Sequence, residues 1–323
     1  MLISASGLFI VIAAVAFDAL IGDPGWLWRH RGHPVSLIAA LIDRLDRKFN
    51  REDHSHELRK AAGIMSTAIL VVTAAAVGAL IQVIVQSLPA GNILLALIAS
   101  IFIAQRSLYQ HVAAVRSAFA KGGLPAAREA VAMIVGRDPE HLDEAGVCRA
   151  AIESCAENFS DGVVAPVFWL ALLGLPGLIA YKAINTADSM IGHRTERYRS
   201  FGRAAARLDD LVNLVPARLS ALLLAVAAPV ARGSISKSWS IVRRDASQHR
   251  SPNAGWPESA MAGALGLALA GPRHYAEHTV DDPFLNAEAT SEAVPDDIGR
   301  ALNVYIAACV IEAAVYAALA LVV

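Results

Sequence analysis

A group of acidic residues stands directly before an apolar segment in the middle of the chain. Glu153, Glu157 and Asp161 are spaced at i, i+4 and i+8, which places their carboxylates on one face of an α-helix. Like charges at this spacing repel one another, and a divalent cation such as Mg²⁺ between them offsets the repulsion. A solvated helix face is the alternative, but Cys155 and Phe159 are not typical of solvent-exposed positions. We therefore predict a functional site that binds a metal ion.

A second polar group follows an apolar segment further along the chain. Asn185, Asp188 and Ser189 are spaced at i, i+3 and i+4, so on a helix they face the same way. Their oxygen atoms suit a hard cation or a phosphate-bound Mg²⁺, and His193 and Arg194 could contact an anionic oxygen. Capping and turn formation are the usual roles of such residues and would explain this motif if it stood alone. Beside the acidic group, it indicates a second part of one site.

Other polar residues occur where substrate binding competes with a structural role. Asp23 lies in a Gly-Asp-Pro turn, where a cap is usual, and His33 precedes a proline and should be extended. Arg218 lies within an apolar segment, where a charge exposed to lipid is costly. It should pair with Asp210 or with a substrate acid, unless its long side chain reaches the membrane surface. Asn253 lies in a Pro-Asn-Ala-Gly-Trp turn that could close over a site.

The sequence lacks several common site types. It contains no G-x-x-x-x-G-K-[ST] phosphate-binding loop, no G-x-S-x-G nucleophile elbow and no H-E-x-x-H zinc motif. The three cysteines are odd in number and form no C-x-x-C pair, which argues against a disulfide framework or a zinc site. The net charge of −1 gives no sign of the positive surface of a nucleic-acid-binding protein, so we expect no nucleic-acid partner.

The segments that must position these residues are long and apolar. Hydrophobic residues make up 55% of the 323 residues and charged residues only 18%, whereas soluble domains usually have about 25% charged residues. About 20 mostly apolar residues cross the hydrocarbon layer of a membrane. Six segments approach or exceed that length, namely 2–21, 61–88, 91–112, 163–184, 211–231 and 301–323. A seventh segment, 259–270, is shorter and is typical of a helix packed among others or of a re-entrant piece.

We therefore predict an all-α fold, a polytopic integral membrane helical bundle with broken or re-entrant helices, in a single domain over residues 1–323. Gly174 begins a Gly-Leu-Pro-Gly sequence that should break the 163–184 segment into a hairpin. The first segment has no basic leader and no clear cleavage site, which indicates a retained span. Basic residues are concentrated in 22–60, whereas the link around Pro89 has none, so the first loop should be cytoplasmic. We expect the cell (inner) membrane, with the active site on the cytoplasmic side.

At these residues the sequence resembles the CobD/CbiB family of cobalamin biosynthesis, the membrane adenosylcobinamide-phosphate synthases. The matching segments, in chain order, are DALIGDPGWLWRHRGHPV, ESCAENFSDGVVAPVFW, YKAINTADSMIGHRTERYRSFGRAAARLDDLVNLVPAR and SPNAGWPESAMAGAL. They run from Asp18 to Leu265 and cover most of the chain. Four ordered motifs of this length are far more specific than the spacing of any single group.

The resemblance implies ATP-dependent amide bond formation between a side-chain carboxylate of adenosylcobyric acid and aminopropanol or its O-phosphate. Mg²⁺ and ATP are the expected cofactors, and the corrinoid is a substrate. Together with the spacing, the resemblance predicts as catalytic residues Glu157, Asp161, Asp188 and His193. The predicted metal ligands are Glu153, Glu157, Asp161 and Asp188. The predicted substrate-binding residues are Asp23, His33, Asn185, Arg194, Asp210, Arg218 and Asn253.

Two other classes of function are compatible with parts of the sequence. Secondary transporters also have broken spans and buried charges, although no paired repeat is visible in this chain. A membrane scaffold for soluble corrinoid enzymes would bind its partners without turnover, and the acidic motifs would have no role in it. Besides its substrates and the lipid bilayer, the expected partners are other cobalamin-assembly enzymes.

Overall fold

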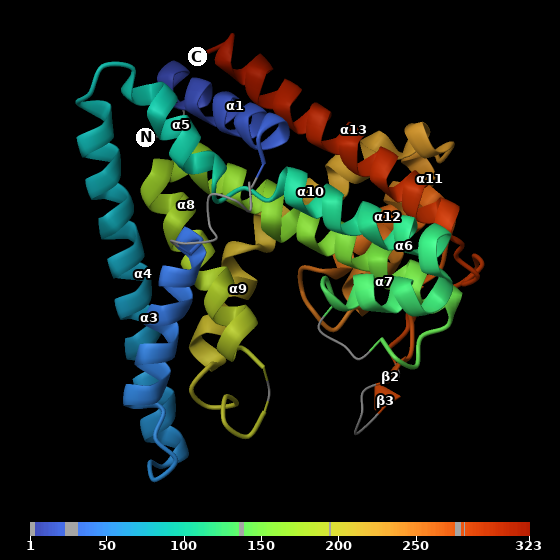
Figure 1. The fold of residues 1–323 in the computed structure, drawn as a ribbon, viewed down its shortest axis with the longest axis horizontal. Helices are drawn as coiled ribbons and strands as arrows, with labels where there is room; N and C mark the ends of the chain where they lie inside the picture. The colour runs from blue at the N-terminus through green and yellow to red at the C-terminus, as the bar shows by residue number, and fades with distance from the viewer. Residues whose placement is uncertain (1–3, 23–31, 136–138, 194, 275–278, 281) are drawn as a thin grey trace. The chain divides into compact units, whose positions relative to one another are not determined.

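The chain forms two compact units in the computed structural model, which describes residues 4–22, 32–135, 139–193, 195–274, 279–280 and 282–323 (Figure 1). The first unit comprises Met1–Ala104, Ala165–Asn213 and Tyr316–Val323. The second comprises Gln105–Val164 and Leu214–Val315. The described residues are mostly helical, and the strands among them have only two residues each. The prediction of an all-α fold is therefore confirmed.

The first unit combines apolar helices with two amphipathic ones. Its helices are α1 (Ala5–Leu20), α3 (Pro34–Phe49), α4 (His56–Gln86), α5 (Gly91–Ser100), α8 (Ala165–Ile191) and α9 (Arg203–Val212). The amphipathic helices α3 and α9 each pack against both α4 and α8, and α4 packs most extensively against α8 (Figure 1). Amphipathic helices bury one apolar face and leave the charged face outside. α3 and α9 therefore contribute polar residues such as Asp46 and Asp209 to this unit.

Helix α4 is long enough to cross a bilayer without interruption. Its 31 residues extend about 46 Å at 1.5 Å per residue, which exceeds the roughly 30 Å of membrane hydrocarbon. Ser55 caps its start by accepting the N–H of Leu58. Large apolar side chains on its outer surface, such as Val72, Leu80 and Val83, are exposed. A broad exposed apolar surface of this kind is typical of a helix that faces lipid.

Helix α8 is interrupted at Gly174, which confirms the predicted break. Gly174 has φ 70° and ψ −158°, a conformation that favours glycine. The N–H of Leu175, next in the chain, donates to Oε1 of Gln82 on α4 at 2.9 Å. Backbone groups released by a break in a membrane helix need such a partner, because lipid offers none. The helix then resumes through Pro176, which is tolerated because it stands at the start of the new helical segment.

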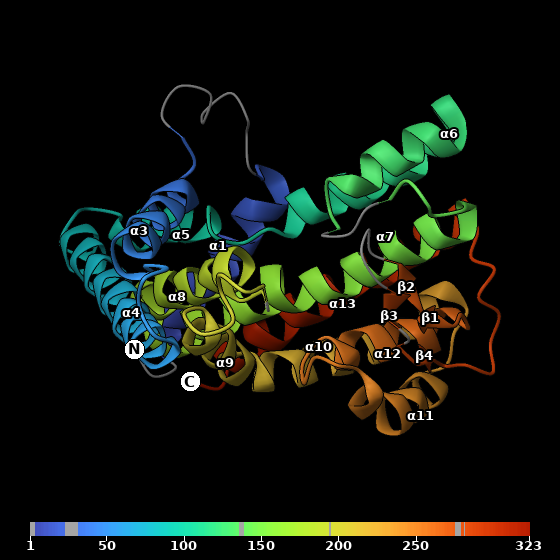
Figure 2. The same cartoon turned by 90° about the horizontal axis from the view of Figure 1, so that it is seen from below.

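The second unit surrounds a short buried helix, α12 (Gly255–Leu265). Its other elements are α6 (Gln105–Ala132), α7 (Glu144–Phe159), η1 (Ser160–Val164), α10 (Leu214–Ala227), η2 (Ala228–Ala231), α11 (Ile235–Asp245), η3 (Ala246–Gln248), the antiparallel pairs β1 (Leu269–Ala270) with β4 (Phe284–Leu285) and β2 (Arg273–His274) with β3 (Thr279–Val280), and most of α13 (Pro295–Ala320). α12 packs against α7, α10 and α11 (Figure 2). Its many alanine and glycine residues allow this close approach, as predicted for a short helix packed among others.

Five helical segments in the described part of the chain are long and apolar enough to cross a membrane, namely His56–Gln86, Gly91–Ala132, Glu144–Ile191, Leu214–Ala231 and Pro295–Ala320. Two predicted spans need correction. α1 has 16 residues and is shorter than the predicted 2–21. The predicted 91–112 span is not one helix, because α5 ends at Ser100 and α6 begins at Gln105. Phe102 and Ile103 are buried in the turn between them, so tertiary packing determines the break.

Candidate functional site

Polar side chains of the first unit meet where α8 ends and α9 packs against it. The amides of Asn185 and Asn213 both donate to the carboxyl group of Asp209, at 3.4 Å and 3.0 Å. The hydroxyl of Tyr181 donates to Oδ1 of Asn213 at 2.9 Å. Asp209 is only 8% exposed, and a buried carboxyl group needs such partners. Asp209 is not among the predicted site residues; its i, i+4 spacing from Asn213 was the signal that could have identified it.

Two half-buried carboxyl groups lie near this buried one. Asp188 interacts electrostatically with Asp210 and His193, and Asp209 interacts with both Asp188 and Asp210. Burial, reinforced by the charge of Asp188, raises the pKa of Asp209 to about 7, although its two amide hydrogen bonds act in the opposite direction. The structure therefore brings the predicted Asn185, Asp188, His193 and Asp210 together with Asp209. We call these five residues the α8–α9 acidic site.

A buried polar network holds the loop that follows His193. Arg197 donates to Asp46 of α3 at 2.6 Å, and Asn50 donates to Asp46 at 2.7 Å and to the Arg197 carbonyl at 3.2 Å. Arg59 of α4 donates to Asn50 at 2.8 Å and to the same carbonyl. Because three of these side chains are buried, the network both satisfies them and fixes the loop. The loop between α8 and α9 is thus anchored on α3 and α4.

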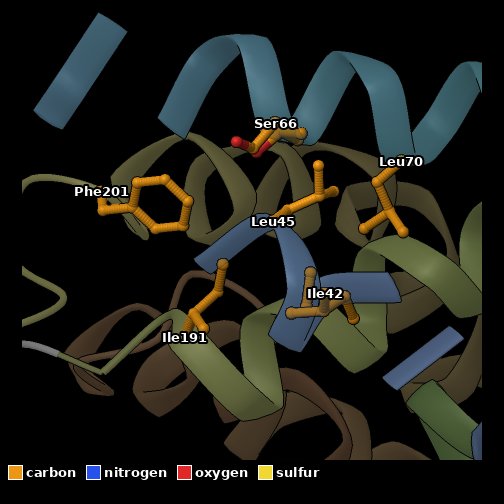
Figure 3. A pocket seen from close by; sticks show the side chains of 8 residues that line it. Ile42, Leu45, Ser66, Leu70, Ile191 and Phe201 are labelled. Atoms are coloured by element: carbon orange, nitrogen blue, oxygen red, sulfur yellow. The ribbon is translucent and has the colours of Figure 1, made fainter. Parts of the chain in front are cut away.

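A small apolar cavity lies next to the C-terminal half of α8. It is lined by Ile42, Leu45, Ser66, Thr67, Leu70, Ala187, Ile191 and Phe201, and Figure 3 shows Ile42, Leu70, Ile191 and Phe201 around it. Its volume of about 10 Å³ has room for about one water molecule. Pockets for small molecules usually have volumes of about 300–1,000 Å³. The cavity is therefore a gap in the packing of α3, α4 and α8, too small for a nucleotide or a corrinoid.

The predicted residues near the N-terminus are only partly described. Nδ1 of His33 accepts the N–H of Val35 at 3.2 Å and caps the start of α3. This contact satisfies one of the N–H groups that a helix start leaves open. A contact between His33 and substrate stays a prediction. Asp23 and Arg194 lie outside the described residues.

The three carboxylates of the first acidic group have different environments in the second unit. Glu153 is buried and accepts the N–H of Ala270 at 3.0 Å, whereas Glu157 is exposed and Asp161 is half-buried. Asp161 lies in η1, which is a π-helical turn and is wider than the α-helical turn of 3.6 residues. The α-helical spacing on which the predicted acidic face depends therefore ends with α7 at Phe159, before Asp161. The metal-binding roles stay predictions, and single π turns are frequent at functional sites.

Arg218 is held by a turn in the second unit. Its Nη1 donates to the carbonyls of Leu214 and Pro252 at 2.9 Å and 3.3 Å and to Oδ1 of Asn253 at 3.1 Å. The guanidinium lies over the ring of Trp256, 4.3 Å from its centroid, a favourable cation–π arrangement. In the part of the chain that the structure describes, Nη1 makes all the hydrogen bonds of this guanidinium. Nε and Nη2 are the atoms that could bind an anionic substrate group, and the predicted Arg218 and Asn253 do lie together.

The oxygen donors of the acidic groups are chemically suited to Mg²⁺. In proteins this ion usually binds one or two carboxylates together with substrate phosphates, and the half-buried Asp188 and Asp210 fit that pattern. Among the described residues, no three His, Cys, Asp or Glu side chains lie close enough to hold a metal ion by themselves. Asp161 belongs to the second unit and Asp188 to the first. Their convergence on one ion stays a prediction.

The fold and these polar groups define a polytopic helical membrane protein with polar side chains gathered near the ends of membrane-length helices. The family model for the CobD/Cbib protein matches residues 11–305, which include both units' polar groups. The chain belongs to this family.

Curated relatives match nearly the whole chain. A cobalamin biosynthesis protein CobD of Rhizobium meliloti (strain 1021) is 48% identical over 321 residues, which are 98% of each chain. The protein of the same name from Brucella anthropi is 49% identical over 304 residues, and that from Rhodobacter capsulatus is 47% identical over 296 residues, each covering 92% of both chains. No solved structure matches the chain.

Proposed function

We propose that this protein acts in cobalamin biosynthesis and joins aminopropanol, or its O-phosphate, to a side-chain carboxylate of adenosylcobyric acid. The reaction forms an amide bond, consumes ATP and yields adenosylcobinamide or its phosphate. Family membership and the names of the relatives support the pathway. The structural observation that supports the chemistry is the α8–α9 acidic site, where carboxyl and amide groups gather at the end of a membrane helix.

The carboxylate substrate must acquire a leaving group before an amine can replace its oxygen. ATP cleavage supplies the driving force, and a bound Mg²⁺ would neutralise the oxygens of ATP. Asp188 and Asp210 are the residues of the first unit that would hold this ion, and Glu157 and Asp161 are the candidates in the second. Glu153 is a weaker candidate because one of its oxygens already accepts the Ala270 N–H.

The amine must lose a proton in order to attack the activated carboxyl carbon. A positioned side chain within hydrogen-bonding reach can accept that proton. We assign this step to Asp188 or His193, which interact electrostatically with one another. Arg218 and Asn253 would hold an anionic group of the substrate, because the hydrogen bonds of the guanidinium to the described residues are made by Nη1 and Nε and Nη2 can donate to an oxyanion.

We place the protein in the cell (inner) membrane with these groups on the cytoplasmic side. The five membrane-length helices support the membrane location. The concentration of Lys and Arg in residues 22–60 supports the orientation, and ATP is a cytoplasmic substrate.

Product formation by the purified protein tests this proposal. The protein in detergent is incubated with adenosylcobyric acid, Mg²⁺–ATP and either amine, and the product mass is determined together with ATP consumption. The proposal expects a new amide product without any membrane gradient. Gradient-driven corrinoid uptake into proteoliposomes without product would instead support a transporter. Binding of corrinoid enzymes without turnover would support a scaffold.

Loss of a single carboxylate should abolish most of this activity. We expect Asp188→Asn and Asp161→Asn each to lower the rate at least about 100-fold, the usual effect of removing a catalytic acid, base or ion-binding group. Glu196→Gln removes a charge from an exposed position in the loop that follows α8 and should leave the rate unchanged. Circular dichroism and thermal unfolding would verify that the variants are folded. Full activity in both Asp variants would refute the assignment.

A further inference from the structure

The turn that holds Arg218 is itself fixed by a chain of hydrogen bonds. Oγ of Ser251 accepts the N–H groups of Asn253 and Ala254, both at 3.2 Å. The N–H of Trp256 donates to the Asn253 carbonyl at 3.0 Å. These bonds fix the backbone that carries Asn253 and Trp256, whose side chains both contact Arg218. We call residues 251–256 the arginine turn.

His249 connects the arginine turn to a buried carboxyl group. Its Nδ1 accepts the N–H of Ser251 at 3.0 Å, so the neutral ring carries its proton on Nε2. Nε2 lies 3.7 Å from Oε2 of Glu258. The side chains of His249 and Glu258 are 8% and 2% exposed, which leaves little room for a substrate to reach either one. The pair therefore faces the turn and not a ligand.

Gly255 shows that the turn sits directly on His249. A Cβ atom at position 255 would lie 2.5 Å from Cβ of His249 and would overlap the carbonyl oxygen of Ala246. Such close backbone packing fixes the distance between the turn and the histidine ring. It also places Glu258, one helical turn after Ala254, on the side of α12 that meets His249.

We infer that His249 and Glu258 are positioning residues, which hold the arginine turn so that Arg218 presents Nε and Nη2 to an oxyanion of the substrate. Glu258 packs beside the His249 ring, with its Oε2 beyond hydrogen-bonding distance of Nε2 at 3.7 Å. The ring accepts the Ser251 N–H, and Ser251 in turn fixes the backbone of Asn253 and Ala254. A carboxylate of the corrinoid and a phosphate of ATP or of the amine are the two sources of such an oxyanion. This inference rests on the proposed function for its substrates, but the position of Arg218 can be measured without them.

Fluorescence of Trp256 reports the position of Arg218 independently of activity. The Trp256 contribution is the difference between the emission of each variant and that of the same variant carrying Trp256→Phe. Arg218→Gln should change this emission, because the cation over the ring is lost. His249→Ala and Glu258→Ala should change it in the same direction, whereas Glu258→Gln, which keeps a side chain of the same size packed beside Nε2, should restore the wild-type emission.

Steady-state kinetics give the second measurement. KM is determined separately for adenosylcobyric acid, Mg²⁺–ATP and the amine phosphate. Arg218→Gln should raise one of the three KM values about tenfold or more, as expected for a lost charge-assisted hydrogen bond, and that substrate supplies the oxyanion. His249→Ala should raise the same KM with a smaller effect on kcat. In the Arg218→Gln background, His249→Ala should have no further effect on this KM, because His249 acts through Arg218.

Asp245→Asn is the matched control, since Asp245 is an equally buried carboxylate of the same unit with other partners. It should lower stability without changing the Trp256 emission or any KM. Unchanged emission and KM in both His249→Ala and Glu258→Ala, or fully additive KM effects with Arg218→Gln, would overturn the inference. If wild type makes no product, the proposed function fails, and the emission measurements still decide whether the pair positions Arg218.

Discussion

Two buried carboxyl groups, those of Asp209 and Asp245, have different surroundings, and their pKa values shift in opposite directions. Burial and the neighbouring charge of Asp188 raise the pKa of Asp209 to about 7, against the opposite effect of its two amide hydrogen bonds. Asp245 is bound by Arg244 through two hydrogen bonds of 2.7 Å and 3.0 Å and by the Asn286 N–H at 2.7 Å. Burial opposes ionisation of Asp245, but these donors hold its pKa below the usual range. The charged partner of Asp245 thus stabilises its ionised form, whereas the surroundings of Asp209 oppose ionisation.

Removing the charge of Asp245 should reduce stability in a pH-dependent way. The folded-state pKa is depressed, so this carboxylate stabilises the fold above the unfolded-state pKa of about 3.9 and stops doing so as pH falls through the lower folded value. We expect Asp245→Asn to cost about 1–3 kcal/mol at pH 7 and the difference from wild type to shrink below about pH 4. Unfolding curves of the two proteins in detergent, recorded from about pH 7 to below about pH 4, would measure this difference in the free energy of unfolding. A difference that is constant with pH would contradict the role of the charge.

The break in α8 makes a prediction about a whole element. Gln82 on α4 accepts the N–H of Leu175, whose side chain is fully buried. Gln82→Leu leaves this N–H without its partner in an apolar region and should cost about 1–3 kcal/mol. It should also accelerate amide hydrogen exchange in residues 174–178. Gln86→Leu changes an exposed glutamine of the same helix and is the control. Equal stability and exchange in the two variants would show that Gln82 does not hold the break.

Hydropathy and local motifs predict the elements of this protein better than their interruptions. The apolar stretch of α4 and the Gly174 break are local properties, and both are visible in the sequence. The turn between α5 and α6 is not visible in the sequence, because Phe102 and Ile103 are as apolar as the helices around them. Both side chains are buried in the fold. The π turn at Asp161 is not predicted either, because the predicted spacing assumes a constant 3.6 residues per turn.

The candidate site was predictable where its residues are close in sequence. Asn185 and Asp188 share a helix, and their relation to each other follows from helical spacing. Asp209 joins them only when α9 packs against α8. The His249–Glu258 pair depends on the turn between the two residues, and neither side chain stands out as chemically unusual in the sequence. Contacts made through tertiary structure therefore account for most of the site residues that sequence analysis missed.

At the scale of the whole molecule, both units contribute polar groups to the proposed function. The first unit holds the α8–α9 acidic site, and the second holds Arg218 with the arginine turn. The family match over residues 11–305 includes both. The proposed reaction needs both kinds of group, because it combines an ion-dependent nucleotide with an anionic corrinoid substrate. The proposed reaction therefore requires that both groups be accessible from the cytoplasmic side of the membrane.

The orientation of α4 provides a test of that side. The loop before α4 is basic, and the turn after it around Pro89 is uncharged, so the positive-inside rule places the two ends on opposite faces. Cys148, Cys155 and Cys309 are buried, which should keep background thiol labelling low. A membrane-impermeant maleimide should label Asp53→Cys only in inverted vesicles and Ser87→Cys only in right-side-out vesicles or intact spheroplasts. Labelling of both positions from one side would show that α4 does not cross the bilayer. Labelling of Asp53→Cys from outside and of Ser87→Cys from the cytoplasmic side would place the basic loop, and the proposed active site, outside the cytoplasm.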